Sequence, residues 1–251
     1  MSSLTNVVIC LPVYHQDHKV KDCLESLFNN TQADDVSITV AIGINGANDE
    51  LVDAINKYTS WPSAHSNINK VIIEDFGKNL GKGACVNRLV QIAATSETNY
   101  VVSMDSDLIV KGATWLSTLI NAHCVSSRYE KVGGISADQE VSSCHLEKGY
   151  GVLVYDSITF RKYDGNNGVA GGLLLIPYKV WNQFGGYKAH NLYGSDDGHF
   201  GQDCAVNGMS VLLCKDVVVI HPPETNADYA QWKQRSVKNE LHLEEKTGYR
   251  F

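Results

Sequence analysis

The chain has 251 residues, of which 43% are hydrophobic and 20% are charged, a composition that is typical of a soluble globular protein and excludes a disordered one. Its 28 acidic and 21 basic side chains leave a net charge of −7, which argues against a protein that coats nucleic acid through a cationic surface. No apolar run approaches the ~20 residues that span a bilayer, the first residues lack the pattern of a signal peptide, and the seven cysteines form no CxxC pair, so we expect a cytoplasmic protein in a reducing compartment.

Patterns in the first half of the chain alternate between strand and helix. Apolar runs predict strands at 7–11, 36–44, 70–74 and 99–104. Apolar residues at helical spacing predict helices that begin near Asp17, cover 49–58 and run through 85–93. This alternation implies a mostly parallel sheet with helices on both faces.

The second half is less regular. Its patterns predict strands at 131–136, 151–160, 169–176 and 211–220. A helix is expected around 114–124, another between Pro177 and Gly185–Gly186, and a third before Gly208. The polar segment from residue 225 is expected to be helical. Because no repeat, low-complexity linker or break in composition interrupts the chain, we expect one domain with a C-terminal extension.

Two acidic side chains, Asp105 and Asp107, directly follow a predicted buried strand. In open α/β sheets, ligands bind beyond the carboxyl ends of strands, where two such carboxylates can share Mg²⁺ or Mn²⁺. His221 follows the last apolar strand, and its imidazole could complete the metal site. The alternative interpretations are a solvated acidic turn and a histidine that only caps its strand.

Two further segments carry candidate chemistry. Asp196 and Asp197 precede a predicted helix, where they act either as helix caps or, for one of them, as a general base; Asp203 is a further candidate for the base. The segment 78–83, KNLGKG, has glycines that allow a phosphate to approach the backbone and two lysines that add charge, although its spacing is not that of a P-loop.

Six segments resemble, in order, those of the family 2 glycosyltransferases, which have the GT-A fold. They are CLPVYHQD at 10–17, NLGKGACVN at 79–87, MDSD at 104–107, GGLLLIPYKVWNQFGGY at 171–187, Asp196–Asp197 with Gly208, and VVVIHP at 217–222. The resemblance implies a GT-A-like α/β domain over 1–224, with a Rossmann-like nucleotide-binding half at about 1–107 and an acceptor half at about 108–224. Residues 225–251 would be a helical extension or a lid.

The resemblance also implies an activity, the inverting transfer of a hexosyl or pentosyl group from a nucleotide-diphosphate sugar, with UDP as the expected nucleotide, to a hydroxyl acceptor. Asp197 would be the base, and Asp105, Asp107 and His221 would hold Mn²⁺ or Mg²⁺. The residues expected to contact the nucleotide sugar are Pro12, Tyr14, Asn45, Asn79, Lys82, Asp105, Gly171 and Gly172. Asn45 stands where the family often has an acidic residue that contacts the nucleobase of the donor.

Several alternatives stay open at this point. A sugar-1-phosphate nucleotidyltransferase uses a similar sheet, and a non-catalytic metal- or carbohydrate-binding module would need no base. The segment 225–238, with Tyr229, Trp232, Lys233 and Arg235, could fold over the donor or form a solvated helix. A glycan, a lipid-linked sugar, a small molecule, a protein or a modified DNA base could be the acceptor, and the sequence does not indicate the oligomeric state.

Overall fold

The computed structural model describes residues 4–14, 17–33, 35–46, 49–58, 68–140, 151–163, 169, 171–189, 192, 194, 196–228 and 230–236. The expected roles of Tyr229 and of the tail beyond residue 236 lie outside this described part, as do residues 15–16 of the first resemblance segment. No described helix is long and apolar enough to cross a membrane, and the six described cysteines form no disulfide.

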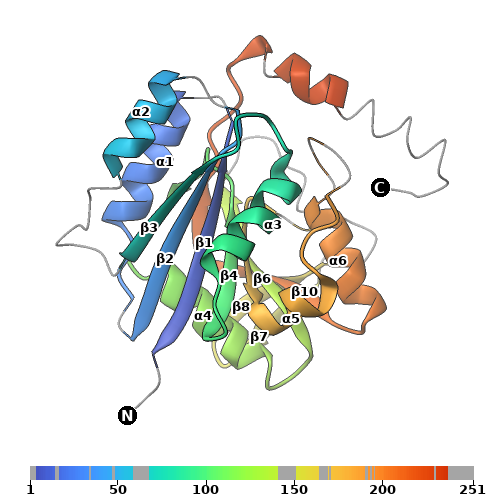
Figure 1. Ribbon diagram of the computed structural model, residues 1–251. Coiled ribbons are helices and arrows are strands. Elements are labelled where there is room, and N and C mark those ends of the chain that lie inside the picture. Colours follow the sequence, from blue (N-terminus) through green and yellow to red (C-terminus); the bar gives the residue numbers. More distant parts are fainter. Residues whose placement is uncertain are drawn as a thin grey trace.

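One ten-stranded sheet forms the centre of the molecule, in the order β3-β2-β1-β4-β9-β6-β10-β8-β7, with β5 paired to β10 (Figure 1). The strands are β1 (Thr5–Val13), β2 (Val36–Ile44), β3 (Ile68–Asp75), β4 (Thr98–Met104), β5 (Ile109–Val110), β6 (Val132–Glu140), β7 (Val152–Tyr155), β8 (Ile158–Lys162), β9 (Leu173–Pro177) and β10 (Ser210–Ile220). The first four strands are parallel, β9 is antiparallel to β4 and β6, and β6 is parallel to β10. The predicted mostly parallel core is therefore confirmed.

Helices cover both faces of the sheet, as the alternating pattern predicted (Figure 1). The helices are α1 (Asp17–Asn29), α2 (Asp49–Tyr58), α3 (Lys82–Ala93), α4 (Trp115–Ser126), α5 (Tyr178–Phe184) and α6 (Asp196–Val206). Side chains of α1, α2 and α4 pack into one hydrophobic core, and those of α3, α5 and α6 pack into the other. β1 shows why two cores form, since Val7, Ile9 and Leu11 enter the first while Val8 and Cys10 enter the second.

Three sequence predictions differ from the structure. The predicted strand 151–160 is a hairpin, β7 and β8, that turns at Asp156 and Ser157 with positive φ angles. The strand predicted at 169–176 begins only at Leu173, because Gly171 and Gly172 form a turn before it. The two-residue strand β5 was not predicted, since so short an apolar segment gives no periodic signal.

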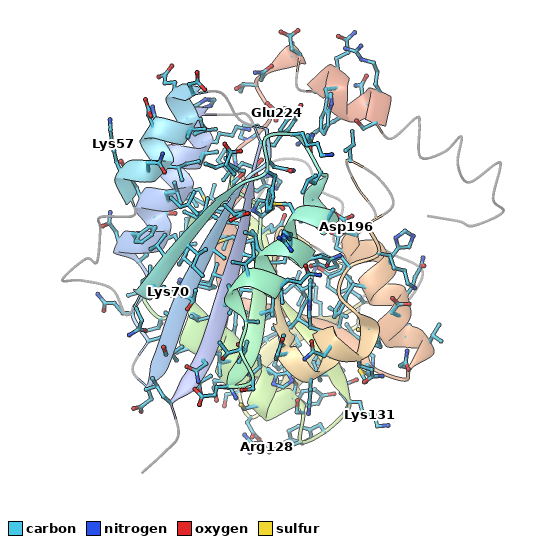
Figure 2. The ribbon with its side chains drawn as sticks, viewed as in Figure 1. Lys57, Lys70, Arg128, Lys131, Asp196 and Glu224 are labelled. Carbon is cyan, nitrogen blue, oxygen red and sulfur yellow. The ribbon has the colours of Figure 1, made fainter. Side chains whose placement is uncertain are left out.

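The parallel strands bring several chain segments to one edge of the sheet. β1, β2, β4 and β10 all end there, and they are followed by Tyr14, Asn45, Asp105 and His221. The antiparallel strand β9 begins at the same edge, where the backbone N–H of Asp105 donates a hydrogen bond of 2.7 Å to the Gly172 carbonyl. Figure 2 shows Glu224 and Asp196 toward this edge, with Arg128 and Lys131 at the opposite end of the molecule.

Candidate active site

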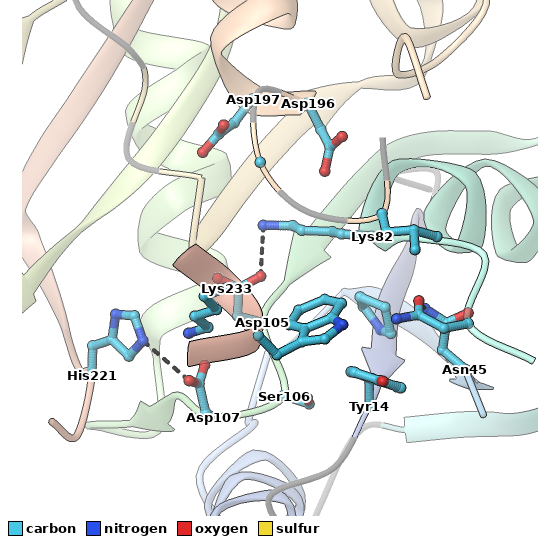
Figure 3. Close-up of a pocket in the computed structure, with 15 residues that line it drawn as sticks. Tyr14, Asn45, Lys82, Asp105, Ser106, Asp107, Asp196, Asp197, His221 and Lys233 are labelled. Atoms are coloured by element: carbon cyan, nitrogen blue, oxygen red, sulfur yellow. Dashed lines mark hydrogen bonds and ion pairs between the residues drawn. The ribbon is translucent and has the colours of Figure 1, made fainter. Parts of the chain in front are cut away.

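A cavity of about 190 Å³ lies at the carboxyl edge of the sheet (Figure 3). It is lined by Pro12, Tyr14, Asn45, Asn79, Lys82, Asp105, Ser106, Asp107, Leu192, Gly194, Asp196, Asp197, His221, Trp232 and Lys233. All the site residues predicted from the sequence line this cavity except Gly171 and Gly172, which lie directly behind it against Asp197 and Asp105. Segments separated by more than 200 residues in the sequence thus meet in one place.

Asp107 and His221 form a pair at one side of the cavity (Figure 3). Asp107 Oδ2 lies 3.2 Å from His221 Nε2, and both side chains are largely buried. Burial is the largest single influence and raises the pKa of Asp107, but the hydrogen bond to His221 and the positive charges of His221, Lys233 and Lys19 together outweigh it, so the net pKa is below its usual value. The same hydrogen bond raises the pKa of His221, against the effect of burial. The carboxylate is therefore ionised at neutral pH.

Asp105 has a different partner, the ammonium group of Lys82. Lys82 Nζ lies 2.6 Å from Asp105 Oδ1 and donates a hydrogen bond of 3.0 Å to the Gly171 carbonyl. Burial alone lowers the pKa of Lys82, but Asp105 and Asp197 outweigh it, so the pKa is raised and the lysine stays charged. Burial raises the pKa of Asp105, and Lys82 opposes that effect. Asp105 and Asp107, which the sequence predicted to share a cation, are thus each paired with a different basic side chain.

Asp107 and His221 supply one carboxylate oxygen and one imidazole nitrogen, a donor set that suits Mn²⁺ and Mg²⁺ when further oxygen ligands are available. Among the described residues, no three His, Cys, Asp or Glu side chains gather closely enough to hold a metal ion. A divalent cation at this pair would therefore complete its coordination with oxygens of water or of a phosphate-bearing ligand.

Asn45 and Asn79 hold the backbone of the loop that leads into α3. Asn45 Oδ1 accepts a hydrogen bond of 2.7 Å from the Leu80 backbone N–H, and Asn45 Nδ2 donates one of 2.9 Å to Asn79 Oδ1. Asn79 Oδ1 also accepts from the Gly81 N–H at 2.8 Å. Gly81 has a φ of 85°, a left-handed conformation that favours glycine. Lys82 is the next residue, so these bonds fix where its side chain starts.

The two acids at the start of α6 occupy different environments. Asp196 is buried against Gly83, and the carboxylate of Asp197 lies against Gly171, where Oδ1 accepts a hydrogen bond of 2.9 Å from the Gly198 N–H. Both line the cavity. Asp203 is not among the lining residues and forms an ion pair with Lys188. Of the three candidates for the base, only Asp196 and Asp197 face the cavity.

The segment after β10 returns over the cavity (Figures 1 and 3). Residues 230–236 are helical, and Trp232 and Lys233 line the cavity. Both residues were expected there from the sequence, whereas Lys19 and Glu224, which form ion pairs next to Lys233, were not. Lys19 Nζ is 3.6 Å from Glu224 Oε2. The available signal was a lysine next to the apolar face of the predicted first helix.

The sequence of residues 8–174 matches the model of the family described as Glycosyl transferase family 2. The matched range includes the Asp105–Asp107 segment and the loop at 79–83 and ends before Asp197 and His221. A search of curated proteins gave no match.

Three solved structures resemble the fold. They are the mannosyltransferase PcManGT from Pyrobaculum calidifontis in complex with GDP-Man and Mn²⁺ (TM-score 0.64, 15% identity, 91% of this chain), GalNAc-T7 with UDP, GalNAc and Mn²⁺ (0.63, 12%, 88%), and TarS from S. aureus (0.62, 12%, 87%). This chain spans 60%, 44% and 37% of their respective lengths. At these identities the likeness concerns the fold, and it confirms the predicted GT-A-like α/β architecture.

Proposed function

The chain belongs to glycosyl transferase family 2, and on this premise we propose that it transfers a sugar from a nucleoside diphosphate sugar to a hydroxyl acceptor, with inversion at the anomeric carbon. One observation carries the proposal, namely that a single cavity is lined by the Asp107–His221 pair and by the carboxylate of Asp197. The first can hold a cation for a diphosphate, and the second can accept a proton. The structural relatives with GDP-Man and Mn²⁺ and with UDP and Mn²⁺ support this donor class.

In the proposed reaction, Asp107 and His221 would hold Mn²⁺ or Mg²⁺. When bound, the cation supplies positive charge that stabilises the diphosphate as it leaves. Lys82 adds a permanent charge at the same wall of the cavity and keeps Asp105 neutralised. Of the two roles expected for Asp105, donor binding and metal binding, we therefore propose the first.

Asp197 is the proposed base. Its carboxylate accepts the proton of the acceptor hydroxyl while that oxygen attacks the anomeric carbon, and the bond from this carbon to the diphosphate oxygen breaks on the opposite face. The attack and departure on opposite faces give inversion. Asp197 faces the cavity with its second oxygen lying against Gly171, whereas Asp203 is engaged by Lys188 outside it.

The remaining features fit one catalytic domain over residues 1–224, with the nucleotide at the β1–β4 side and the acceptor at the β6–β10 side. Pro12, Tyr14, Asn45 and Asn79 line the cavity and are the proposed contacts of the nucleotide. UDP is the first nucleotide to test and GDP the second. The segment from residue 225 would cover the donor and exclude water from it.

The proposal is tested with the variants Asp197→Asn and Asp203→Asn. Release of nucleoside diphosphate is measured from a panel of UDP and GDP sugars with Mn²⁺, with water as the acceptor. Asp197→Asn is expected to lower turnover by about 10²–10⁴-fold, the usual contribution of a general base, while calorimetry shows an unchanged donor Kd. Asp203→Asn removes the same charge from the same helix and should leave turnover unchanged. Undiminished turnover in Asp197→Asn contradicts the assignment.

A further inference from the structure

Two of the side chains that line the candidate active site form an aromatic pair. The ring of Trp232, on the segment after β10, packs on the ring of Tyr14, which follows β1, with centroids 5.1 Å apart and planes tilted by 46°. Both rings line the cavity. The remaining volume of about 190 Å³ is below the about 300–1,000 Å³ of typical small-molecule sites. With Trp232 packed on Tyr14, the cavity is thus smaller than most sites that hold a ligand of nucleotide size.

A carboxylate between two lysines connects that segment to the body of the protein. Glu224 Oε2 lies 3.6 Å from Lys19 Nζ and 3.8 Å from Lys233 Nζ. Lys19 belongs to α1, and its side chain is only 5% exposed. Lys233 is adjacent to Trp232 and is more accessible, at 24%. Glu224 thus bridges the buried Lys19 of α1 and the more exposed Lys233 of the segment. Of these two ion pairs, the one with Lys233 can break more easily.

Lys233 also lies near the proposed metal ligands. Its positive charge lowers the pKa of both Asp107 and His221, although other causes of their shifts are larger. Figure 3 shows its ammonium group on the side of the cavity where Asp107 and Asp105 lie. A diphosphate bound to a cation at Asp107 and His221 would therefore come within reach of Lys233.

We propose that donor binding exchanges the partners of this segment. Trp232 leaves Tyr14 so that the nucleobase stacks between the two rings, and Lys233 leaves Glu224 for the diphosphate, while Glu224 stays with Lys19. The inference rests on the proposed function, since it requires a nucleoside diphosphate donor. The exchange is favourable for two reasons. Stacking on aromatic rings stabilises any nucleobase. The ammonium group of Lys233 also binds a phosphate more strongly than it binds the partly exposed carboxylate of Glu224. The closed segment then excludes water from the reacting bond.

The first test compares nucleotides with nucleosides, using calorimetry with UDP, GDP, uridine and guanosine in the presence of Mn²⁺. Lys233→Met is expected to raise the Kd of the nucleoside diphosphates by at least about tenfold and to leave that of the nucleosides unchanged. Trp232→Ala should weaken both classes by at least about fivefold. The matched control is Arg235→Met, because Arg235 is on the same segment but bonds to Gln231 and does not line the cavity. Unchanged binding in Lys233→Met overturns the exchange.

The second test concerns Glu224. Glu224→Gln removes the competitor for Lys233 and should lower the nucleoside diphosphate Kd by about two- to fivefold, the effect of a partly exposed ion pair. This gain should vanish in the double variant Lys233→Met/Glu224→Gln. A gain that persists there means that Glu224 only repels the phosphates, which overturns the exchange. If the unmodified protein binds no nucleoside diphosphate, the proposed function fails; if it binds and the variants behave alike, only the exchange fails.

Discussion

Gly171 is the residue against which the side chain of the proposed base, Asp197, packs. A Cβ atom at this position would overlap the carboxylate of Asp197, meeting Oδ2, Cβ and Cγ of that side chain. The Gly171 carbonyl also accepts the hydrogen bond from Lys82. The absence of a side chain thus lets an acid from α6 and a lysine from α3 approach the same backbone residue. Any larger residue would move Asp197 away from its observed position.

This close contact predicts that Gly171→Ala lowers turnover by about 10²-fold or more, because an error of about 1 Å in the position of a reacting group has that effect. Release of nucleoside diphosphate is measured as for Asp197→Asn, and the thermal unfolding temperature is recorded for the same variant. Gly151→Ala is the matched control, since a Cβ there meets no atom within 4 Å. Full turnover in Gly171→Ala would show that Asp197 is not held at this backbone for catalysis.

At the residue scale, the sequence predicted where side chains gather better than it predicted their partners. Strand ends are visible in the sequence, so Asp105 and His221 were expected at one edge, the resemblance implied Asn45 as a donor contact, and all three line one cavity. The sequence does not show that the Asn45 amide is used by Leu80 and Asn79, or that Lys82 pairs with Asp105. These contacts depend on the three-dimensional approach of a loop, which no local pattern encodes.

At the scale of elements, α4 contains a histidine, His123, that does not line the candidate active site. His123 is 8% exposed, and its Nδ1 lies 3.0 Å from the hydroxyl of Tyr100 on β4. Its Nε2 lies 3.2 Å from the Ser127 hydroxyl. Burial lowers the pKa of His123 to about 4, and Lys179 adds to the effect. The helix is therefore attached to the sheet by a histidine that must stay neutral.

This environment predicts an acid-dependent loss of stability. The unfolded chain binds a proton at His123 near the usual value of 6.5, and the folded protein does so only near 4. Stability from this group is thus complete above 6.5 and declines as the pH falls toward 4, by up to about 3 kcal/mol. Urea unfolding across this window should show the slope, and His123→Gln should reduce it. An equal slope in both proteins would assign the loss to other groups.

Element prediction succeeded where periodicity was long and failed where the backbone departs from common conformations. β2 and α2 have the predicted bounds, since nine and ten patterned residues leave little ambiguity. The β7–β8 hairpin was predicted as one strand because its turn uses Asp156 and Ser157 with φ values of 46° and 74°. Positive φ is usually signalled by glycine or asparagine, and neither stands in this turn.

At the scale of the whole molecule, the net charge of −7 does not describe the active-site edge. Lys82 and Lys233 line the cavity, and Lys19 pairs with Glu224, which is also the partner of Lys233. Asp105 and Asp107 there are paired with Lys82 and His221, so a diphosphate that bound with a metal would meet positive partners in an otherwise acidic protein. Composition could exclude a general nucleic-acid coat but could not reveal this local arrangement, because the lysines come from α1, α3 and the C-terminal segment.

Binding of the metal and nucleotide to the whole protein should depend on pH through His221. Asp107 raises the pKa of His221, and an imidazole must lose its proton to bind a cation, so binding releases a proton. The affinity for UDP with Mn²⁺ should therefore rise with pH between about 5.5 and 8, by up to about tenfold per unit below that pKa. Asp107 stays ionised across this window because its own pKa is lowered.

Calorimetry in two buffers with different ionisation enthalpies measures the proton released, and His221→Asn should abolish both the release and the slope. An affinity that is flat with pH in the unmodified protein would remove His221 from the metal site and leave Asp107 without its proposed partner ligand.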